Sequence, residues 1–275
     1  MKKLLLLLIL IISFSSSAQQ NAINLKWNIS DTLTYKTIIK DTYHEDGVDE
    51  NKTDSLSGDL GSTLREMRNK MAHSTYESKL FPDEKGNIDI LINAVQTDST
   101  DSFFSKITKM TGVPFLRGKV SPEGELLSFY YKREHKNMTS LLFELPNNPM
   151  EVGDEWNLNI NLISLDQNFY ADTLQRKNIA RLKDIIIKNG NRIAVIEYNV
   201  QEYVSGTNEM TMKSMFPKLK DKKVNMKTSY TGTGEFDIDD GYWISYDGTM
   251  ETDTDFSLFD FNTHKTTEFK LTLKK

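Results

Sequence analysis

Alternating side chains are the feature that most limits how this chain can fold. Several runs repeat a core-type residue at every second position, and short glycine-containing segments separate them. A period of two places these residues on one face of a β-strand, so each run predicts a strand with one buried face. The repeating members are Leu33, Tyr35, Thr37 and Ile39; Ile88, Ile90 and Ile92; Ala194, Ile196, Tyr198 and Val200; Phe236, Ile238, Tyr242, Ile244 and Tyr246; and Phe269, Leu271 and Leu273.

Four of the separating segments are short, polar and centred on a glycine: Gly86, Gly124, Gly190 and Gly241. Glycine reaches the positive φ that tight hairpin turns require, so these segments predict hairpins and therefore antiparallel pairs. A parallel nucleotide-binding sheet is not expected, because it would need a helix after nearly every strand. The sequence thus predicts a mainly antiparallel β fold.

A few short helices are predicted among the strands, from apolar residues spaced three, four and seven apart. The three stripes are Phe104, Ile107 and Met110; Met138, Leu141, Leu142 and Leu145, stopped by Pro146; and Met212, Met215, Phe216 and Leu219, distorted or shortened by Pro217. A fourth candidate consists of Leu60, Leu64, Met67 and Met71, with its beginning weakened by two glycines.

The order hairpin, short helix, hairpin occurs twice along the chain. Each copy begins with a predicted tryptophan strand, at Trp27 in the first and at Trp156 in the second. We therefore predict an internal duplication that gives two similar sheet-plus-helix lobes, joined by a stiff segment at 146–149. The predicted boundaries are a signal peptide at 1–18, a first β-rich lobe at 19–145 and a second β-rich lobe at 146–275.

The signal-peptide prediction rests on the first 18 residues. Lys2 and Lys3 precede an unbroken apolar run at 4–12, and small residues Ser16 and Ala18 lie where a signal peptidase cleaves. The run is too short to cross a bilayer core about 30 Å thick, so we expect no transmembrane anchor after cleavage. The chain has no cysteine to carry the lipid of a lipoprotein. We expect an exported protein, either periplasmic or extracellular, and not a lipoprotein.

Charge and missing motifs make several activities unexpected. The chain has 34 basic and 39 acidic residues, and its dense basic run at 218–227 contains no aromatic residue, so we expect no nucleic-acid binding. The four histidines are isolated in sequence, and there is no cysteine, serine-hydrolase motif or phosphate-binding glycine loop. We predict no cofactor. A glycosidase needs only two suitably placed carboxylates, so that class stays open.

One acidic segment, 237–241, resembles the beginning of a calcium loop. Its glycine occupies the fifth position, whereas a calcium loop needs an oxygen ligand there and glycine at the sixth. We therefore interpret the segment as a hairpin turn with exposed aspartates, and we predict no metal site.

Two stretches carry a family resemblance: Leu145-Pro146-Asn147-Asn148-Pro149 followed by Val152-Gly153-Asp154-Glu155-Trp156, and Gly232-Thr233-Gly234-Glu235-Phe236 running to Gly241-Tyr242. Together they resemble an uncharacterised family of secreted proteins from Gram-negative bacteria, which implies no activity. At the level of the fold, the hairpin-helix-hairpin unit is similar to the half-barrels of envelope lipid carriers. That similarity implies a sheet wrapped around an apolar cavity that helices close.

These patterns favour an exported, non-enzymatic envelope protein that binds a lipid, another apolar small molecule or a partner protein. The predicted cavity-lining residues are Phe104, Ile107, Met212, Met215 and Phe216, all of which fit a filled core equally well. The alternatives are a secreted glycan hydrolase that uses paired carboxylates and a purely structural or surface-interaction module.

Overall fold

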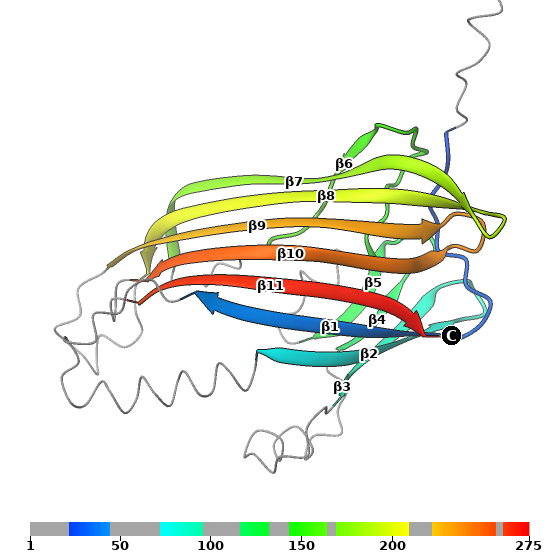
Figure 1. Ribbon diagram of the computed structural model, residues 1–275, viewed down its shortest axis with the longest axis horizontal. Helices are drawn as coiled ribbons and strands as arrows, with labels where there is room; N and C mark the ends of the chain where they lie inside the picture. Colours follow the sequence, from blue (N-terminus) through cyan, green and yellow to red (C-terminus); the bar gives the residue numbers. More distant parts are fainter. Residues whose placement is uncertain are drawn as a thin grey trace, which may run out of the picture.

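The computed structural model describes residues 22–44, 72–95, 116–131, 143–163, 169–208, 222–256 and 261–274. They form one antiparallel sheet of 11 strands (Figure 1), which confirms the mainly antiparallel β prediction. The strands are β1 (Leu33–His44), β2 (His73–Pro82), β3 (Ile88–Val95), β4 (Leu116–Val120), β5 (Leu126–Tyr131), β6 (Glu155–Asn157), β7 (Phe169–Lys188), β8 (Asn191–Asn208), β9 (Lys222–Asp237), β10 (Tyr242–Phe256) and β11 (Phe261–Lys274).

The two halves of the chain share this sheet, whose order is β5-β4-β3-β2-β1-β11-β10-β9-β8-β7-β6. Each half is a meander, and the halves join where β1 pairs with β11 from Thr34 opposite Lys274 to His44 opposite His264. The prediction of two separate lobes at 19–145 and 146–275 therefore gains no support. The physical reason is that β1 and β11 satisfy each other's backbone hydrogen bonds instead of forming the edges of two sheets.

The helix predictions fall mostly outside the described residues. This holds for the stripes that begin at Phe104, Met212 and Leu60, while the stripe that begins at Met138 is described only from Phe143 onward. Phe143, the first described residue of this stripe, has helical geometry, and the described chain continues irregularly from Glu144. Within the described part, the expected few short helices are not found, and strands account for nearly all regular structure.

The hairpin predictions are confirmed at all four glycines. Their φ angles are positive: +79° at Gly86, +82° at Gly124, +94° at Gly190 and +71° at Gly241. Position 241 also has no room for a side chain, because a Cβ there would lie 2.4 Å from the backbone N of Asn28. Close approach and positive φ therefore both require glycine at this turn.

Alternation along the strands gives the sheet an inner face, which carries the core, and a polar outer face. On β8 the predicted residues Ala194, Ile196, Tyr198 and Val200 are all buried. On β1 Tyr35 is buried and Ile39 is half-buried, whereas the intervening Lys36 is exposed. The register aligns the inner residues of neighbouring strands in rows across the sheet.

The alternation prediction is wrong at the beginning of β10. A β-bulge between Trp243 and Ser245 shifts the register against β9. As a result Trp243 is buried at 1% exposure, while Tyr242 and Ile244, which the pattern placed in the core, are only partly buried. The extra residue of a bulge turns the following side chains to the opposite face.

Irregular segments at 22–29, 143–154 and 158–163 pack against the inner face. The backbone N of Trp27 donates to Pro122 O in the β4–β5 turn, and that of Asn28 donates to Gly241 O in the β9–β10 turn. The Trp27 ring lies against Phe143 and Phe236. Trp27 is thus a core residue and not the predicted strand, whereas Trp156 does lie in a strand, β6.

The sheet has two different ends. The tight hairpin turns and the end of β11 lie at one, which we call the turn end, on the right in Figure 1. The strands β1, β3, β5, β8 and β10 end at the other, which we call the loop end. Antiparallel pairing alone dictates this arrangement, because successive strands run in opposite directions.

Candidate functional site

The five predicted cavity-lining residues, Phe104, Ile107, Met212, Met215 and Phe216, lie outside the described residues. The strand ends that flank them are described. Segment 96–115 leaves β3 and returns to β4, and segment 209–221 leaves β8 and returns to β9. All four strands meet these segments at the loop end, so the topology attaches both predicted stripes to the same end of one sheet.

The inner face changes character between the turn end and the loop end. Near the turn end it is packed with aromatic side chains, such as Phe236, Trp243 and Tyr246 in edge-to-face contact. Closer to the loop end a polar row crosses six strands in register. Its members are Tyr43, Lys265, Thr252, Thr228, Glu202 and Arg176, in the order β1, β11, β10, β9, β8 and β7.

Glu202 lies next to Arg176 at the β7 end of this polar row, and each of its carboxylate oxygens accepts two hydrogen bonds. Its Oε1 accepts from Leu162 N at 2.9 Å and from Asn178 Nδ2 at 3.0 Å. Its Oε2 accepts from Ile163 N at 2.9 Å and from Arg176 Nε at 3.3 Å. The carboxylate therefore fastens the segment at 158–163 over the inner faces of β7 and β8.

Asp41 and Lys265 form the second charged pair of the inner face. Lys265 Nζ lies 3.6 Å from Asp41 Oδ1, and the Thr267 hydroxyl donates to the same oxygen at 2.5 Å. Lys265 also lies 6.0 Å from the centre of the Tyr43 ring. Each of these inner-face charges thus has an opposite charge close to it.

Three tyrosines form a cluster between the aromatic core and the polar row. Tyr230 Oη donates to Tyr246 Oη at 2.8 Å, and the rings of Tyr198 and Tyr246 are 5.1 Å apart. Gly232 and Gly248 make room for this arrangement, because a Cβ at either would lie 2.3 Å from Tyr230 Oη. The glycines therefore serve packing of the Tyr230 ring rather than a turn.

Beside this cluster, three buried polar atoms in the described part of the chain lack a hydrogen-bond partner there: Tyr198 Oη, Trp156 Nε1 and Asn178 Oδ1. Trp156 and Tyr198 lie on either side of Ala180 in one row, and Asn178 is two residues from Ala180 on the same face of β7. Buried polar atoms without partners are rare in native proteins and call for a physical explanation.

Glu144 lies in the segment that covers these residues. Its carboxylate accepts from Asn159 N at 2.8 Å and 3.0 Å. Burial raises its pKa above the ordinary value, although the bond from Asn159 counteracts this. Burial also raises the pKa of Tyr198 well above its ordinary value, with further contributions from Tyr230 and Glu144. The tyrosine hydroxyls therefore stay protonated, so they act as hydrogen-bonding groups and not as bases.

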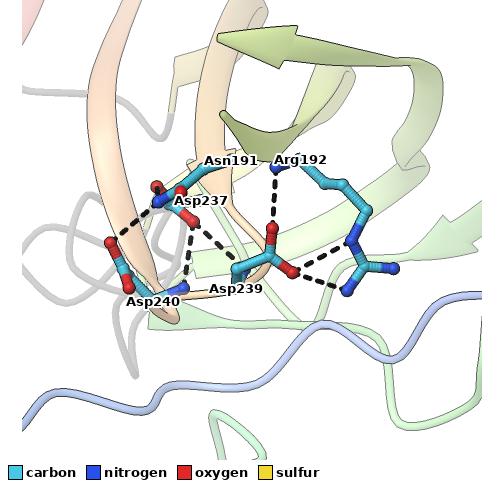
Figure 2. A network of polar contacts seen from close by, with 5 residues as sticks. All are labelled: Asn191, Arg192, Asp237, Asp239 and Asp240. Atoms are coloured by element: carbon cyan, nitrogen blue, oxygen red, sulfur yellow. Dashed lines mark hydrogen bonds and ion pairs between the residues drawn. The ribbon is translucent and has the colours of Figure 1, made fainter. Parts of the chain in front are cut away.

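The acidic turn 237–241 is a structural network (Figure 2). Asp237 Oδ1 accepts from the backbone N of Asp239 at 3.0 Å and of Asp240 at 2.9 Å, and its Oδ2 accepts from Asn191 Nδ2 at 2.8 Å. Asp239 accepts from Arg192 Nε and its terminal nitrogen at 2.9 Å and 2.6 Å, and these bonds lower the pKa of Asp239.

The predicted hairpin turn is thus confirmed, but its description as exposed is wrong for Asp237, which is 3% exposed. Asp237 is buried because it caps the turn from inside, whereas Asp239 and Asp240 face solvent. Donors of the protein itself already occupy these carboxylates.

Two histidines that are far apart in sequence meet on the outer face. His44 and His264 are register partners on β1 and β11, with ring centres 4.8 Å apart, and His264 Nδ1 contacts Asp253 Oδ1. Among the described residues, no group of three or more acidic or histidine side chains is arranged to hold a metal ion. Nor does that part of the chain contain a helix long and apolar enough to cross a membrane.

The sequence contained a signal for Glu202 that the prediction did not use. The alternation from Ala194 to Val200 continues to position 202, which places a glutamate on the buried face of β8. A charge at such a position predicts an oppositely charged partner, here Arg176, whose side chain is 27% exposed. The unpartnered atoms of Tyr198 and Trp156 had no comparable signal, because strand pairing brings them together.

The comparison with known proteins assigns the chain to no family. No protein-family model matches the chain, and no curated protein matches its sequence.

Proposed function

We propose that this is an exported, non-enzymatic envelope protein whose inner sheet face binds an apolar ligand. The observation that carries the proposal is the large apolar inner face of an 11-stranded sheet that does not close into a barrel, since its described edge strands β5 and β6 do not pair with each other. Beyond the packed aromatic core, this face continues with partly buried apolar side chains: Ile39, Met226 and Met250. An apolar sheet face with a few oriented polar groups suits a small apolar ligand.

The predicted lining residues belong to the same proposal. Phe104, Ile107, Met212, Met215 and Phe216 would cover the inner face from the loop end, where their segments are attached. The cleaved signal peptide at 1–18, a periplasmic or extracellular location, a partner protein as a second occupant, and an internal duplication of the two meanders remain hypotheses from the sequence.

Native mass spectrometry tests the proposal. Mature protein purified without detergent from the envelope of its host is expected to carry excess mass that organic solvent extracts as an apolar compound. Replacement of inner-face Met250 by Ala is expected to reduce the bound fraction, whereas Thr249→Ala, its outer-face neighbour on β10, is not. A clean apo mass, with no uptake of added apolar compounds, would contradict the proposal.

One observation favours the alternative of a glycan hydrolase. The pKa of Glu144 is raised by burial, as a general acid requires. A retaining or inverting enzyme also needs a second, available carboxylate. Glu202 has all its oxygens engaged by the protein's own N–H groups, so it does not meet that need. Hydrolysis of envelope glycans that Glu144→Gln abolishes, with folding intact, would establish the enzyme.

A further inference from the structure

One edge of the sheet is only partly covered. Strand β7 has 20 residues, but β6 pairs with it only from Ile179 to Arg181 (Figure 1). Leu158 N still donates to Asn178 O, and after this bond the chain turns over the inner face. Among the described residues, none pairs with the 173–177 stretch of β7 on the side away from β8. We call this stretch the free edge.

The free edge presents its main-chain groups in a fixed pattern. Alternate residues of an antiparallel strand point their N–H and C=O groups to opposite sides. Asn178 points away from β8, since its O accepts from Leu158 N, and the pairing with β8 is regular from 173 to 182. Leu174 and Arg176 therefore also point outward. Arg176 is exposed as a whole residue although its side chain is only 27% exposed, which indicates that its main chain reaches solvent.

The two limits of the free edge define one symmetric register. A β-bulge at 171–173 bends the strand at one limit, and the bond to Asn178 O occupies the other. Gln175 lies midway between them. Antiparallel pairing of two copies about Gln175 would place Leu174 of each copy opposite Arg176 of the other, where the two residues exchange both hydrogen bonds. Every outward N–H and C=O of the free edge would then have a partner.

Charges at the ends of the free edge suit this register. Thr173 of one copy would lie opposite Lys177 of the other, and Asp172 directly precedes Thr173. Lys177 would therefore approach an acidic side chain of the second copy. Within one copy, Asp172 has only the exposed Lys223 near it, at 3.9 Å, so it is available for a further ion pair. No like charges would face each other.

The usual protection of an edge strand is weak at this place. Prolines and outward charges normally prevent an edge from pairing, but the free edge has no proline. The guanidinium of Arg176 is held on the inner face, because it donates to Glu202 and to Ile163 O. Leu174 is 48% exposed, and the apolar stem of Arg176 from a second copy would cover it.

We propose that the free edge pairs with the free edge of a second copy of this chain, which joins two sheets into one symmetric dimer. The same surface serves both copies, as in other two-fold dimers, and main-chain hydrogen bonds hold it. The dimer does not depend on a ligand at the inner face. Because the free edge is short, the contact is small, and we expect a dissociation constant in the micromolar range.

Cysteine cross-linking tests the register, because the chain has no cysteine of its own. The two Gln175 residues would face each other at a non-hydrogen-bonded position, with Cα atoms about 4.5 Å apart, which suits a disulfide. Gln175→Cys in the mature protein is expected to give a disulfide-linked dimer on mild oxidation. The control is Gln201→Cys on β8, opposite Lys177 and also exposed. Two such cysteines would be about 14 Å apart across three strand spacings, so this variant should stay monomeric.

Leu174→Pro tests the main-chain bonds. Proline removes an N–H that points away from β8, so the fold should survive, and circular dichroism checks this. Sedimentation velocity at up to about 100 µM is expected to show a reversible dimer of the mature wild type. Leu174→Pro should raise its dissociation constant about 30-fold, because each protomer loses one hydrogen bond to the other. Leu174→Ala keeps the N–H and should have a clearly smaller effect.

The other outcomes would overturn the proposal. A monomeric wild type, or no cross-link in Gln175→Cys, would exclude the dimer. A dimer that Leu174→Pro leaves intact, or equal cross-linking of Gln201→Cys, would show that a different surface or random collision joins the copies. Cross-linking of Gln175→Cys to another envelope protein would assign the free edge to that protein instead. If Leu174→Pro does not fold, the cross-linking result decides.

Discussion

Replacement of Glu202 by Gln tests whether this carboxylate holds the covering segment in place. The substitution preserves the size of the side chain but exchanges one oxygen for an NH2 group. Each carboxylate oxygen accepts from two N–H groups of the protein. Whichever way the new amide points, two buried or partly buried donors therefore face another donor.

The magnitude follows from this geometry. Two unpaired buried donors at about 1–3 kcal/mol each, together with Arg176 left without its counter-charge, give a loss of about 3–5 kcal/mol in the free energy of unfolding. For a chain of this size about 1 kcal/mol lowers the melting temperature by about 2–4 °C, so the expected decrease is about 6–20 °C. Urea unfolding monitored by tryptophan fluorescence and thermal unfolding monitored by circular dichroism measure both quantities.

The matched control is Glu197→Gln on the same strand. Glu197 pairs with Lys183 on the outer face, where both side chains are well exposed, so its loss should cost no more than about 1 kcal/mol. If the two variants unfold within about 0.5 kcal/mol of each other, Glu202 does not fasten the segment at 158–163 and the reasoning is refuted.

Three further predictions concern the turns, the core and pH. Gly241→Ala should lower the free energy of unfolding by about 2–4 kcal/mol, because the new Cβ is strained and collides with Asn28. Gly190→Ala has space for its Cβ and should cost about 1 kcal/mol. Equal losses in denaturant unfolding would contradict the role of close approach. Tyr35→Phe should cost about 1–2 kcal/mol, since Tyr35 Oη donates to the buried Trp243 O at 2.9 Å, and an unchanged melting temperature would count against that bond. Because the folded-state pKa of Glu144 is raised, Glu144 retains its proton in the folded state as pH rises above about 4.5. The stability of wild type relative to Glu144→Gln should therefore fall with increasing pH, and parallel stability curves from pH 4 to 8 would refute this.

Local patterns in the sequence were sufficient for the four hairpin turns and for several of the strands. A hairpin turn depends on a few neighbouring residues, so the four glycines with positive φ could be predicted from their surroundings. The buried residues of β8 and β11 could be predicted because a single strand has a strict period of two. Where an extra residue interrupts that period, as between Trp243 and Ser245, the same argument failed.

The candidate site was beyond the reach of this local reasoning. Trp156, Asn178 and Tyr198 lie on three strands, and only their register places their unpartnered atoms on one part of the inner face. The predicted lining at Phe104 and Met212 remains a prediction, since it lies outside the described residues. Buried polar residues follow no regular spacing in the sequence, and their role depends on the groups that they contact in the folded protein.

The sequence by itself determined the class of fold, because alternation and glycine turns allow little other than antiparallel strands. Tertiary structure alone decided that β1 pairs with β11, which unites two expected lobes in one sheet. It also decided that Trp27 enters the core and that Glu202 fastens the segment above it. Contacts between residues so distant along the chain depend on the complementarity of whole surfaces, which no short stretch of sequence records.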